Sequence, residues 1–139
     1  IRDTSVTGVQ TCALPIWESS VYGNESFDAI LFRLRNEFQD FEIDYFQSNI
    51  EGELIDCLQK SDGLYKGILL NAGGYTHTSV ALADTLAAIR IPVIEIHMSN
   101  IFAREDFRHV SLIGRHCIGS VSGFGPSSYA LGLRYFNML

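Results

Sequence analysis

The sequence is poor in cysteine, and its three cysteines, Cys12, Cys57 and Cys117, are far apart and form no Cys-x-x-Cys pair. An odd, scattered set is typical of reduced thiols and argues against a disulfide framework. The four histidines lack the spacing of zinc ligands. No apolar run approaches membrane-spanning length, and no signal peptide is visible. We therefore expect a cytoplasmic protein without a membrane anchor.

Basic residues are also few, with ten Lys and Arg against sixteen Asp and Glu and a formal net charge of −6. This balance argues against nucleic acid or an anionic membrane as the partner. It does not exclude a small anionic substrate, since a few local donors are enough to bind one. The 139 residues are 47% hydrophobic and 19% charged, which favours one folded domain over disorder.

From residue 26 onward, helix and strand patterns alternate. Ser26 is placed to cap a helix with an apolar stripe of Phe27, Ile30, Leu31, Leu34 and Phe38. A strand is predicted over 41–48 and a short helix over 51–60. A buried strand follows at 67–71, then a helix that Thr76 or Thr78 would cap and that runs to about Arg90.

The second half continues the alternation. We expect a strand over 93–98, a short helix to Phe107 capped by Ser99 or Asn100, a strand near 118–121, and a closing helix with Pro126 in its first turn. Strands alternating with helices predict an α/β fold, with a doubly wound parallel sheet of about five strands and helices on both faces.

Residues 1–16 do not share this pattern, because they mix Thr, Ser, Gly and Gln with no sustained period. The stretch from Thr4 to Ile16 resembles a translated sequencing-adapter read-through, and we interpret 1–16 as a non-native leader and 17–139 as a single domain. An irregular native leader is the alternative. The first strand of the sheet is therefore doubtful on sequence grounds.

Polar groups gather where the predicted strands end, which is where ligands bind in open α/β sheets. They occur in three segments: Asn71-Ala-Gly-Gly-Tyr-Thr-His77, then Glu95-Ile-His97-Met-Ser99-Asn100, then the turn from Arg104 to Arg108. Each segment alone has a structural explanation, such as a turn-capping asparagine or a solvated arginine face. Glu95 precedes His97 by two residues, so it shares a sheet face with the imidazole and could orient it.

Together these segments resemble the type II 3-dehydroquinate dehydratases over about residues 21–139. The pattern includes Gln47-Ser-Asn-Ile-Glu51-Gly-Glu-Leu-Ile-Asp56 upstream and Gly123-Phe-Gly125-Pro-Ser-Ser-Tyr129-Ala-Leu131 downstream. The resemblance implies a flavodoxin-like fold and a cofactor-free, metal-free hydro-lyase of the shikimate pathway of aromatic amino-acid biosynthesis. It also implies trimers that assemble into dodecamers.

The resemblance also implies roles for individual residues. Tyr22 matches the tyrosine base that forms an enolate, His97 the acid that protonates the leaving hydroxyl, and Glu95 its orienting partner. Asp84 matches a residue that reaches a neighbouring subunit's site. The remaining matches are substrate-binding positions: Asn71, His77, Met98, Ser99 and Arg108.

Two departures from the family pattern fall before Tyr22. The asparagine that helps hold the enolate is absent, and Trp17 stands where the loop arginine belongs. A tyrosine is almost wholly protonated at neutral pH without a nearby cation. We therefore expect this chain to be slow or inactive as an enzyme.

Two rival functions stay open at this point. One is a non-catalytic binding or assembly subunit that keeps the pocket and lacks the base. The other is a flavin-binding flavodoxin, against which the lack of a Ser/Thr/Gly-rich phosphate loop after a first strand argues.

Overall fold

A parallel five-stranded sheet forms the centre of the molecule, with the strand order β2-β1-β3-β4-β5. This computed structural model describes residues 5–11 and 25–139. The strands are β1 (Ser5–Thr11), β2 (Glu42–Gln47), β3 (Ile68–Asn71), β4 (Val93–His97) and β5 (Gly119–Ser122). The helices are α2 (Phe27–Glu37), α3 (Glu51–Ser61), α4 (Val80–Ala88) and α5 (Ser127–Asn137).

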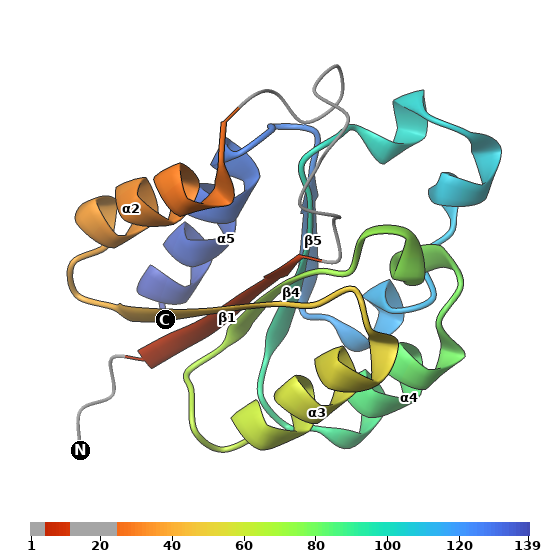
Figure 1. The fold of residues 1–139 in the computed structure, drawn as a ribbon, viewed down its shortest axis with the longest axis horizontal. Coiled ribbons are helices and arrows are strands. Elements are labelled where there is room, and N and C mark those ends of the chain that lie inside the picture. The colour runs from red at the N-terminus through yellow and green to blue at the C-terminus, as the bar shows by residue number, and fades with distance from the viewer. Residues whose placement is uncertain (1–4, 12–24) are drawn as a thin grey trace.

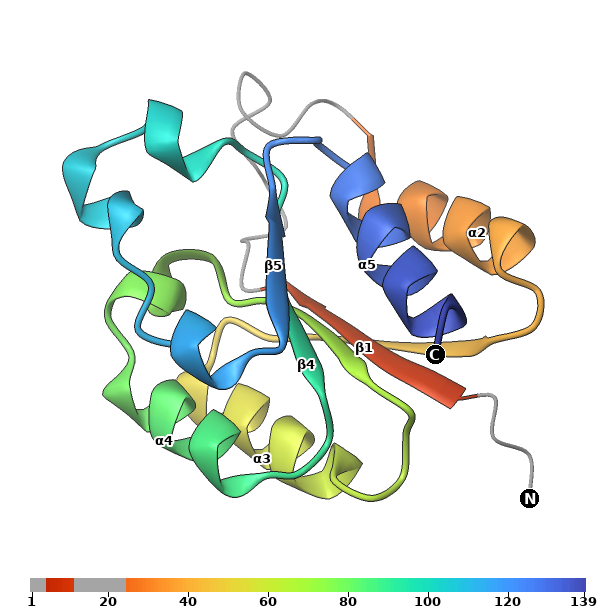
Figure 2. The ribbon, with the colours of Figure 1, turned by 180° about the vertical axis from the view of Figure 1, so that it is seen from behind.

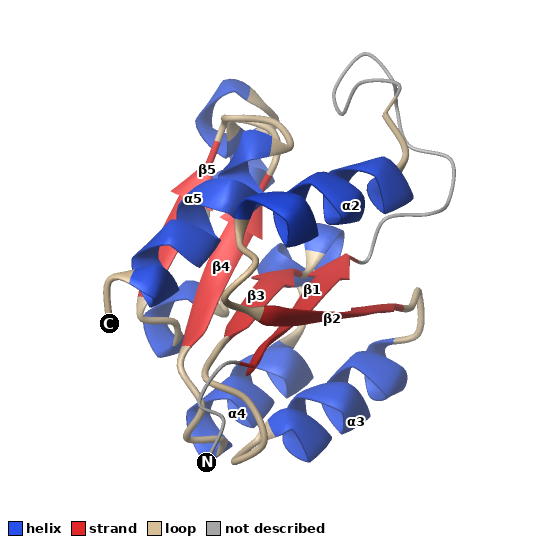
Figure 3. Ribbon diagram, turned by 90° about the vertical axis from the view of Figure 1, so that its left-hand side faces the viewer, coloured by secondary structure: helices blue, strands red, loops and turns tan. Residues whose placement is uncertain are grey.

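The helices cover both faces of the sheet, as the alternation of patterns predicted. Helices α2 and α5 lie on one face and α3 and α4 on the other (Figures 1 and 3). Each pair closes its own apolar core: Leu34 and Leu133 belong to the first, and Leu58 and Leu82 to the second. None of the helices in the described part of the chain is long and apolar enough to cross a bilayer.

Helix α2 follows the predicted stripe. Ser26 adopts an extended conformation and its hydroxyl accepts a hydrogen bond from the Ala29 amide at 3.3 Å, as expected of an N-cap. Phe27 and Phe38, at the two ends of the stripe, are both buried. Phe27 stacks on Tyr45 of β2 with ring centroids 4.4 Å apart, which ties the helix to the edge of the sheet.

Strand β1 lies in the segment whose contribution to the sheet was doubtful on sequence grounds. Ser5–Thr11 lies between β2 and β3 and pairs in parallel with both, with a register shift between Thr7 and Val9. The backbone can fill this position without an apolar period, because ladder hydrogen bonds come from the peptide groups. The origin of residues 1–16 stays a prediction.

The cap predicted for the helix after β3 is wrong. Residues Gly73–His77 form a 3-10 helix (η1), and α4 begins only at Val80. Ser79 is the N-cap: its backbone is extended, and its hydroxyl accepts from the Leu82 amide at 2.9 Å. Thr78 instead donates its hydroxyl hydrogen bond to the Gly74 carbonyl, since it still belongs to the preceding turn.

The helix expected from residue 99 to Phe107 is also replaced by shorter turns. Asn100 accepts from the Phe102 amide and caps a 3-10 helix, η2 (Ile101–Ala103). Arg104 then becomes extended (φ −110°, ψ −165°), which ends the turn before a second 3-10 helix, η3 (Asp106–His109), begins. A further 3-10 helix, η4 (Gly114–His116), leads into β5.

Candidate active site

A small pocket lies at the carboxyl ends of β3 and β4, where η1, η2 and η3 meet the sheet. Figure 2 shows η1 and the turns of 101–109 on the same side of the molecule, and η1 contacts η3. The residues that line the pocket are Asn71, Gly73, His77, His97, Met98, Ser99, Ile101, Arg104 and Arg108. The prediction that the strand-end polar residues converge at one end of the sheet is therefore confirmed.

His97 and Glu95 form a buried pair beneath this pocket. The His97 Nε2 atom lies 2.7 Å from Glu95 Oε1, and the side chains are only 5% and 3% exposed. A carboxylate accepts, so Nε2 carries the hydrogen, and Nδ1 is the ring nitrogen left to exchange a proton. The structure thus places Glu95 in direct contact with the imidazole, and its orienting role stays a prediction.

Asn71 is fixed at the end of β3 by hydrogen bonds to both the nitrogen and the oxygen of its side-chain amide. Its Nδ2 group donates to the buried Tyr129 hydroxyl at 2.8 Å, and its Oδ1 atom accepts from the Gly73 amide at 3.2 Å. One Nδ2 hydrogen is not used by Tyr129. Asn71 is therefore a preorganised donor in the pocket lining.

His77 lies opposite His97, with the two rings roughly parallel and their centroids 6.2 Å apart. His77 Nδ1 donates to the Val110 carbonyl at 2.6 Å, so Nε2 is the nitrogen available to a ligand. The His77 and Phe107 rings also form a T-shaped contact. Two imidazoles held by different elements therefore border one small pocket.

Arginines supply the positive charge of the pocket. Arg108 donates to Glu105 at 2.7 Å and lies over the Phe107 ring, while Arg104 Nη1 lies 3.4 Å from the Ser99 hydroxyl. The pKa of the exposed Glu105 is lowered, first by a hydrogen bond from its own backbone amide and then by Arg108. Two guanidinium groups at one pocket suit a small anion in a protein of negative net charge.

The backbone after β4 adds a further set of donors. Within residues 25–139, the amides of Met98 and Ser99 take part in no backbone hydrogen bond, although Met98 is buried. Both residues line the pocket. Two such amides beside the arginines match the way proteins bind a carboxylate.

Of the predicted site residues that the structure describes, Glu95 and Asp84 are not part of this lining. Asp84 lies on α4 and is exposed, so within this subunit it is not among the residues that line the pocket. Tyr22 and Trp17 lie outside the residues that the structure describes. Their predicted roles therefore stay predictions.

Arg104 and Tyr129 contribute to the site, although neither was predicted from the sequence as a site residue. Arg104 lines the pocket. Tyr129 belongs to the core that α2 and α5 form with the sheet, and its hydroxyl holds the Asn71 side chain. Both lie within family motifs of the sequence: Arg104 in the turn from Arg104 to Arg108, and Tyr129 in the stretch 123–131, at the start of α5. Their position in these motifs was the only sequence signal that could have indicated a role in the site. Neither spacing nor periodicity shows which side chain a buried tyrosine binds.

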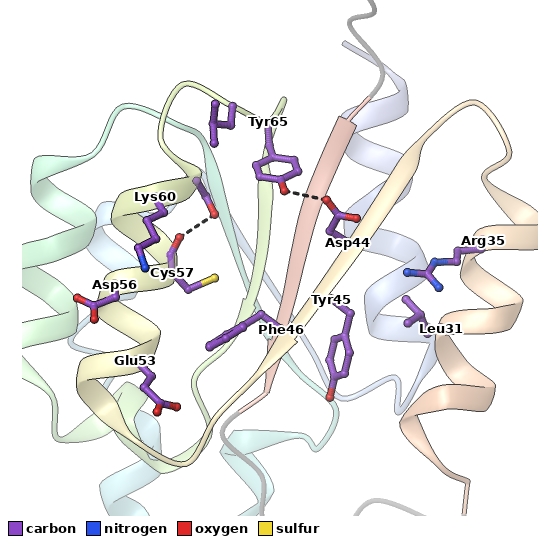
Figure 4. A pocket seen from close by; sticks show the side chains of 12 residues that line it. Leu31, Arg35, Asp44, Tyr45, Phe46, Glu53, Asp56, Cys57, Lys60 and Tyr65 are labelled. Carbon is purple, nitrogen blue, oxygen red and sulfur yellow. Dashed lines mark hydrogen bonds between the residues drawn. The ribbon is translucent and has the colours of Figure 1, made fainter.

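A second, larger hollow lies at the β2 edge, between α2 and α3 (Figure 4). Some of its polar groups are engaged within the protein: Tyr65 donates to Asp44 at 2.7 Å, and Arg35 donates to the Ile43 carbonyl at 2.8 Å. None of the described residues that line it is a histidine, and it shares no lining residue with the smaller pocket. We therefore assign the chemistry to the smaller pocket.

The fold and the site define a flavodoxin-like α/β protein whose pocket combines a carboxylate-held imidazole with donors for a small anionic molecule. The family model described as class II dehydroquinase matches residues 5–137, a range that includes β1. The chain belongs to this family.

Individual relatives agree with this membership. The chain is 50% identical over 119 residues to a 3-dehydroquinate dehydratase of Prochlorococcus marinus, covering 84% of this chain and 81% of the relative. The crystal structure of a type II dehydroquinase from Butyrivibrio crossotus has a TM-score of 0.89 at 33% identity and matches 96% and 97% of the two chains. The corresponding structure from Propionibacterium acnes has a TM-score of 0.90 at 26% identity, over 98% and 97%.

Proposed function

We propose that the protein is a type II 3-dehydroquinate dehydratase, which converts 3-dehydroquinate into 3-dehydroshikimate and water. The observation that carries this proposal is the buried Glu95–His97 pair at an arginine-lined pocket, in a chain of this family. Relatives of 42–50% identity are named for the same reaction. The reaction needs a proton acceptor, a proton donor and a site for a carboxylate, and no redox step.

His97 acts as the proton donor in this proposal. A base removes the proton next to the substrate ketone, the resulting enolate expels the hydroxyl group, and His97 protonates that group so that it leaves as water. Because Nε2 is bound to Glu95, the proton is delivered from Nδ1 of the imidazolium. Glu95 stabilises the charged ring while it holds this proton.

The remaining site residues bind the substrate. The Asn71 amide and the Met98 and Ser99 backbone amides suit the carboxylate end, and His77 and Arg108 suit the hydroxyl groups. Arg104 adds positive charge to the same pocket.

Tyr22 is the proposed base, and the segment before it sets the rate. With Trp17 in place of an arginine and no asparagine to hold the enolate, two electrostatic donors are missing. One such donor contributes roughly 10²–10³-fold to turnover. We propose that the chain as written turns over slowly or not at all, and that Trp17→Arg alone will not rescue it.

Assembly is part of the proposal. Asp84 is exposed on α4, as it must be if it is to reach a neighbouring subunit's pocket. We propose trimers that assemble into a dodecamer.

The test compares three proteins in an absorbance assay for the conjugated enone product, with 3-dehydroquinate added. They are the chain as written, a graft with a family-type first strand and arginine loop, and the graft carrying His97→Ala. The graft should be active, and His97→Ala should lower its kcat by roughly 10²–10⁴-fold. His116→Ala, a change at an exposed histidine, is the matched control and should keep full activity.

Two outcomes would contradict the proposal. Full activity of the chain as written would refute the account of its N-terminal segment. Tight binding of 3-dehydroquinate by the graft without turnover would instead support a non-catalytic binding subunit.

A further inference from the structure

Ser111, in the segment between η3 and η4 and outside the pocket lining, contacts the buried carboxylate of Glu95. Its hydroxyl lies 2.8 Å from Glu95 Oε1, the same oxygen that accepts from His97 Nε2 at 2.7 Å. Its Oγ atom also accepts from the Gly114 amide at 2.9 Å. A continuous chain of hydrogen bonds therefore runs from the backbone of η4 to the imidazole.

The direction of this chain is fixed by its first member. A backbone N–H can only donate, so the Ser111 oxygen accepts from Gly114 and its single hydroxyl hydrogen points to Glu95. Glu95 Oε1 thus accepts twice, from a hydroxyl and from an imidazole. A buried carboxylate needs such donors, because an unpaired one is costly to remove from water.

Gly114 leaves room for the Glu95 carboxylate because it has no side chain. A Cβ atom added at this glycine would lie 2.7 Å from Glu95 Oε2 and 3.1 Å from Ser111 Oγ. Its φ is not positive, so the glycine serves close approach and no unusual backbone conformation. Any larger residue at this position has to push the end of the Glu95 side chain away.

The segment that carries Ser111 is itself anchored. The amide of Leu112 donates to the Thr76 carbonyl at 2.8 Å, and Ile113 is fully buried in the second core. Thr76 belongs to η1, which also carries His77. The position of Glu95 is therefore tied to the element on the opposite side of the pocket.

We infer that Ser111 and Gly114 form a seat for the Glu95 carboxylate, and that Ser111 is a positioning residue which keeps His97 in its Nε2–H tautomer with Nδ1 toward the substrate. The effect of Ser111 on catalysis rests on the proposed function. Its effect on the His97 tautomer depends only on the contacts within this chain.

The structural part is tested without turnover. Protein labelled with ¹⁵N at histidine reports the tautomer of each ring, and His97→Gln identifies the His97 signal; solution or solid-state NMR is used according to assembly size. The parent should show His97 as the Nε2–H tautomer. Ser111→Ala and Gly114→Ala should populate the other tautomer, and Ser111→Thr, which keeps the hydroxyl, should restore the parent pattern.

The catalytic part is tested in the active graft. Loss of one hydrogen bond to a charged group predicts that Ser111→Ala lowers kcat about tenfold, with KM changed by less than about twofold. Ser111→Thr should recover most of the loss. The matched controls are Ser127→Ala, at an exposed serine, and Gly119→Ala, where an added Cβ meets nothing within 4 Å.

The results separate this inference from the proposed function. An unchanged His97 tautomer in folded Ser111→Ala and Gly114→Ala overturns the seat, whatever the enzyme activity. A graft without turnover overturns the proposed function, while the tautomer result still decides the seat. If Ser111→Ala does not fold, Gly114→Ala carries the test with Gly119→Ala as its control.

Discussion

The Asn71–Tyr129 hydrogen bond offers a quantitative test of how the pocket is held. Tyr129 is fully buried, and its hydroxyl accepts from Asn71 Nδ2 at 2.8 Å. Tyr129→Phe removes only the hydroxyl and leaves the ring packing, including the edge contact with Phe27 at 5.4 Å, in place. The main change is therefore a buried amide group that has lost its acceptor.

An unsatisfied buried polar group costs about 1–3 kcal/mol. For a chain of 139 residues, an unfolding entropy of about 2.1 cal/mol/K per residue amounts to about 0.3 kcal/mol/K. Tyr129→Phe should then lower Tm by about 3–10 °C. Affinity for 3-dehydroquinate should fall as well, since Asn71 is no longer held as a donor.

The assay is thermal unfolding followed by circular dichroism, with Tyr135→Phe on the same helix as the control. Tyr135 is 44% exposed, so its change should stay within about 0.5 kcal/mol. In a double-mutant cycle, Asn71→Leu and Tyr129→Phe together should cost less than the sum of the two single changes, because both partners are then apolar. Equal Tm values for Tyr129→Phe and Tyr135→Phe, or strict additivity, would refute the reasoning.

Three further predictions concern other parts of the molecule. Gly132→Ala should lower the urea midpoint, because its Cβ would lie 2.8 Å from Leu69 Cδ2, whereas Gly52→Ala has open space and should raise it slightly. Burial, with the nearby Glu95 charge, raises the pKa of Cys117 to about 12. As the pH rises, the thiol of the unfolded chain ionises before the buried thiol of the folded chain. The contribution of Cys117 to the free energy of unfolding is therefore fully present below about pH 8.5 and is lost toward pH 12, at up to about 1.4 kcal/mol per pH unit. Cys117→Ala should therefore flatten the alkaline fall in urea stability between pH 8 and pH 10, and an equal slope in both proteins would count against it. Light scattering should show an assembly larger than a dimer, and Asp84→Ala in the graft should lower turnover without dissociating it; a fully active monomer would rule out the shared site.

The parts of the fold that sequence predicted were those in which one periodic signal decides the structure. The apolar stripe from Phe27 to Phe38 and the buried run from Ile68 gave α2 and β3 within one or two residues. The Glu95–His97 pair followed from the two-residue period of a strand.

The errors arose where several capping residues compete. Thr76, Thr78 and Ser79 all suit a helix start, and only the extent of the preceding 3-10 turn decides that Ser79 is the cap. Likewise, the extended backbone of Arg104 divides the 101–109 segment, and no local sequence signal marks that break. Ser111 was missed for another reason: its partner Glu95 lies sixteen residues away, and only tertiary structure brings them together.

The central position of β1 in the sheet has a consequence for a chain that lacks this strand. Because β1 pairs with β2 on one side and β3 on the other, a chain without it would expose two inner strand edges that face one gap. Such a gap is a template for an added strand, as in donor-strand complementation. A synthetic peptide of family-type first-strand sequence could then be supplied in trans, which would turn the N-terminal segment into an exchangeable cassette.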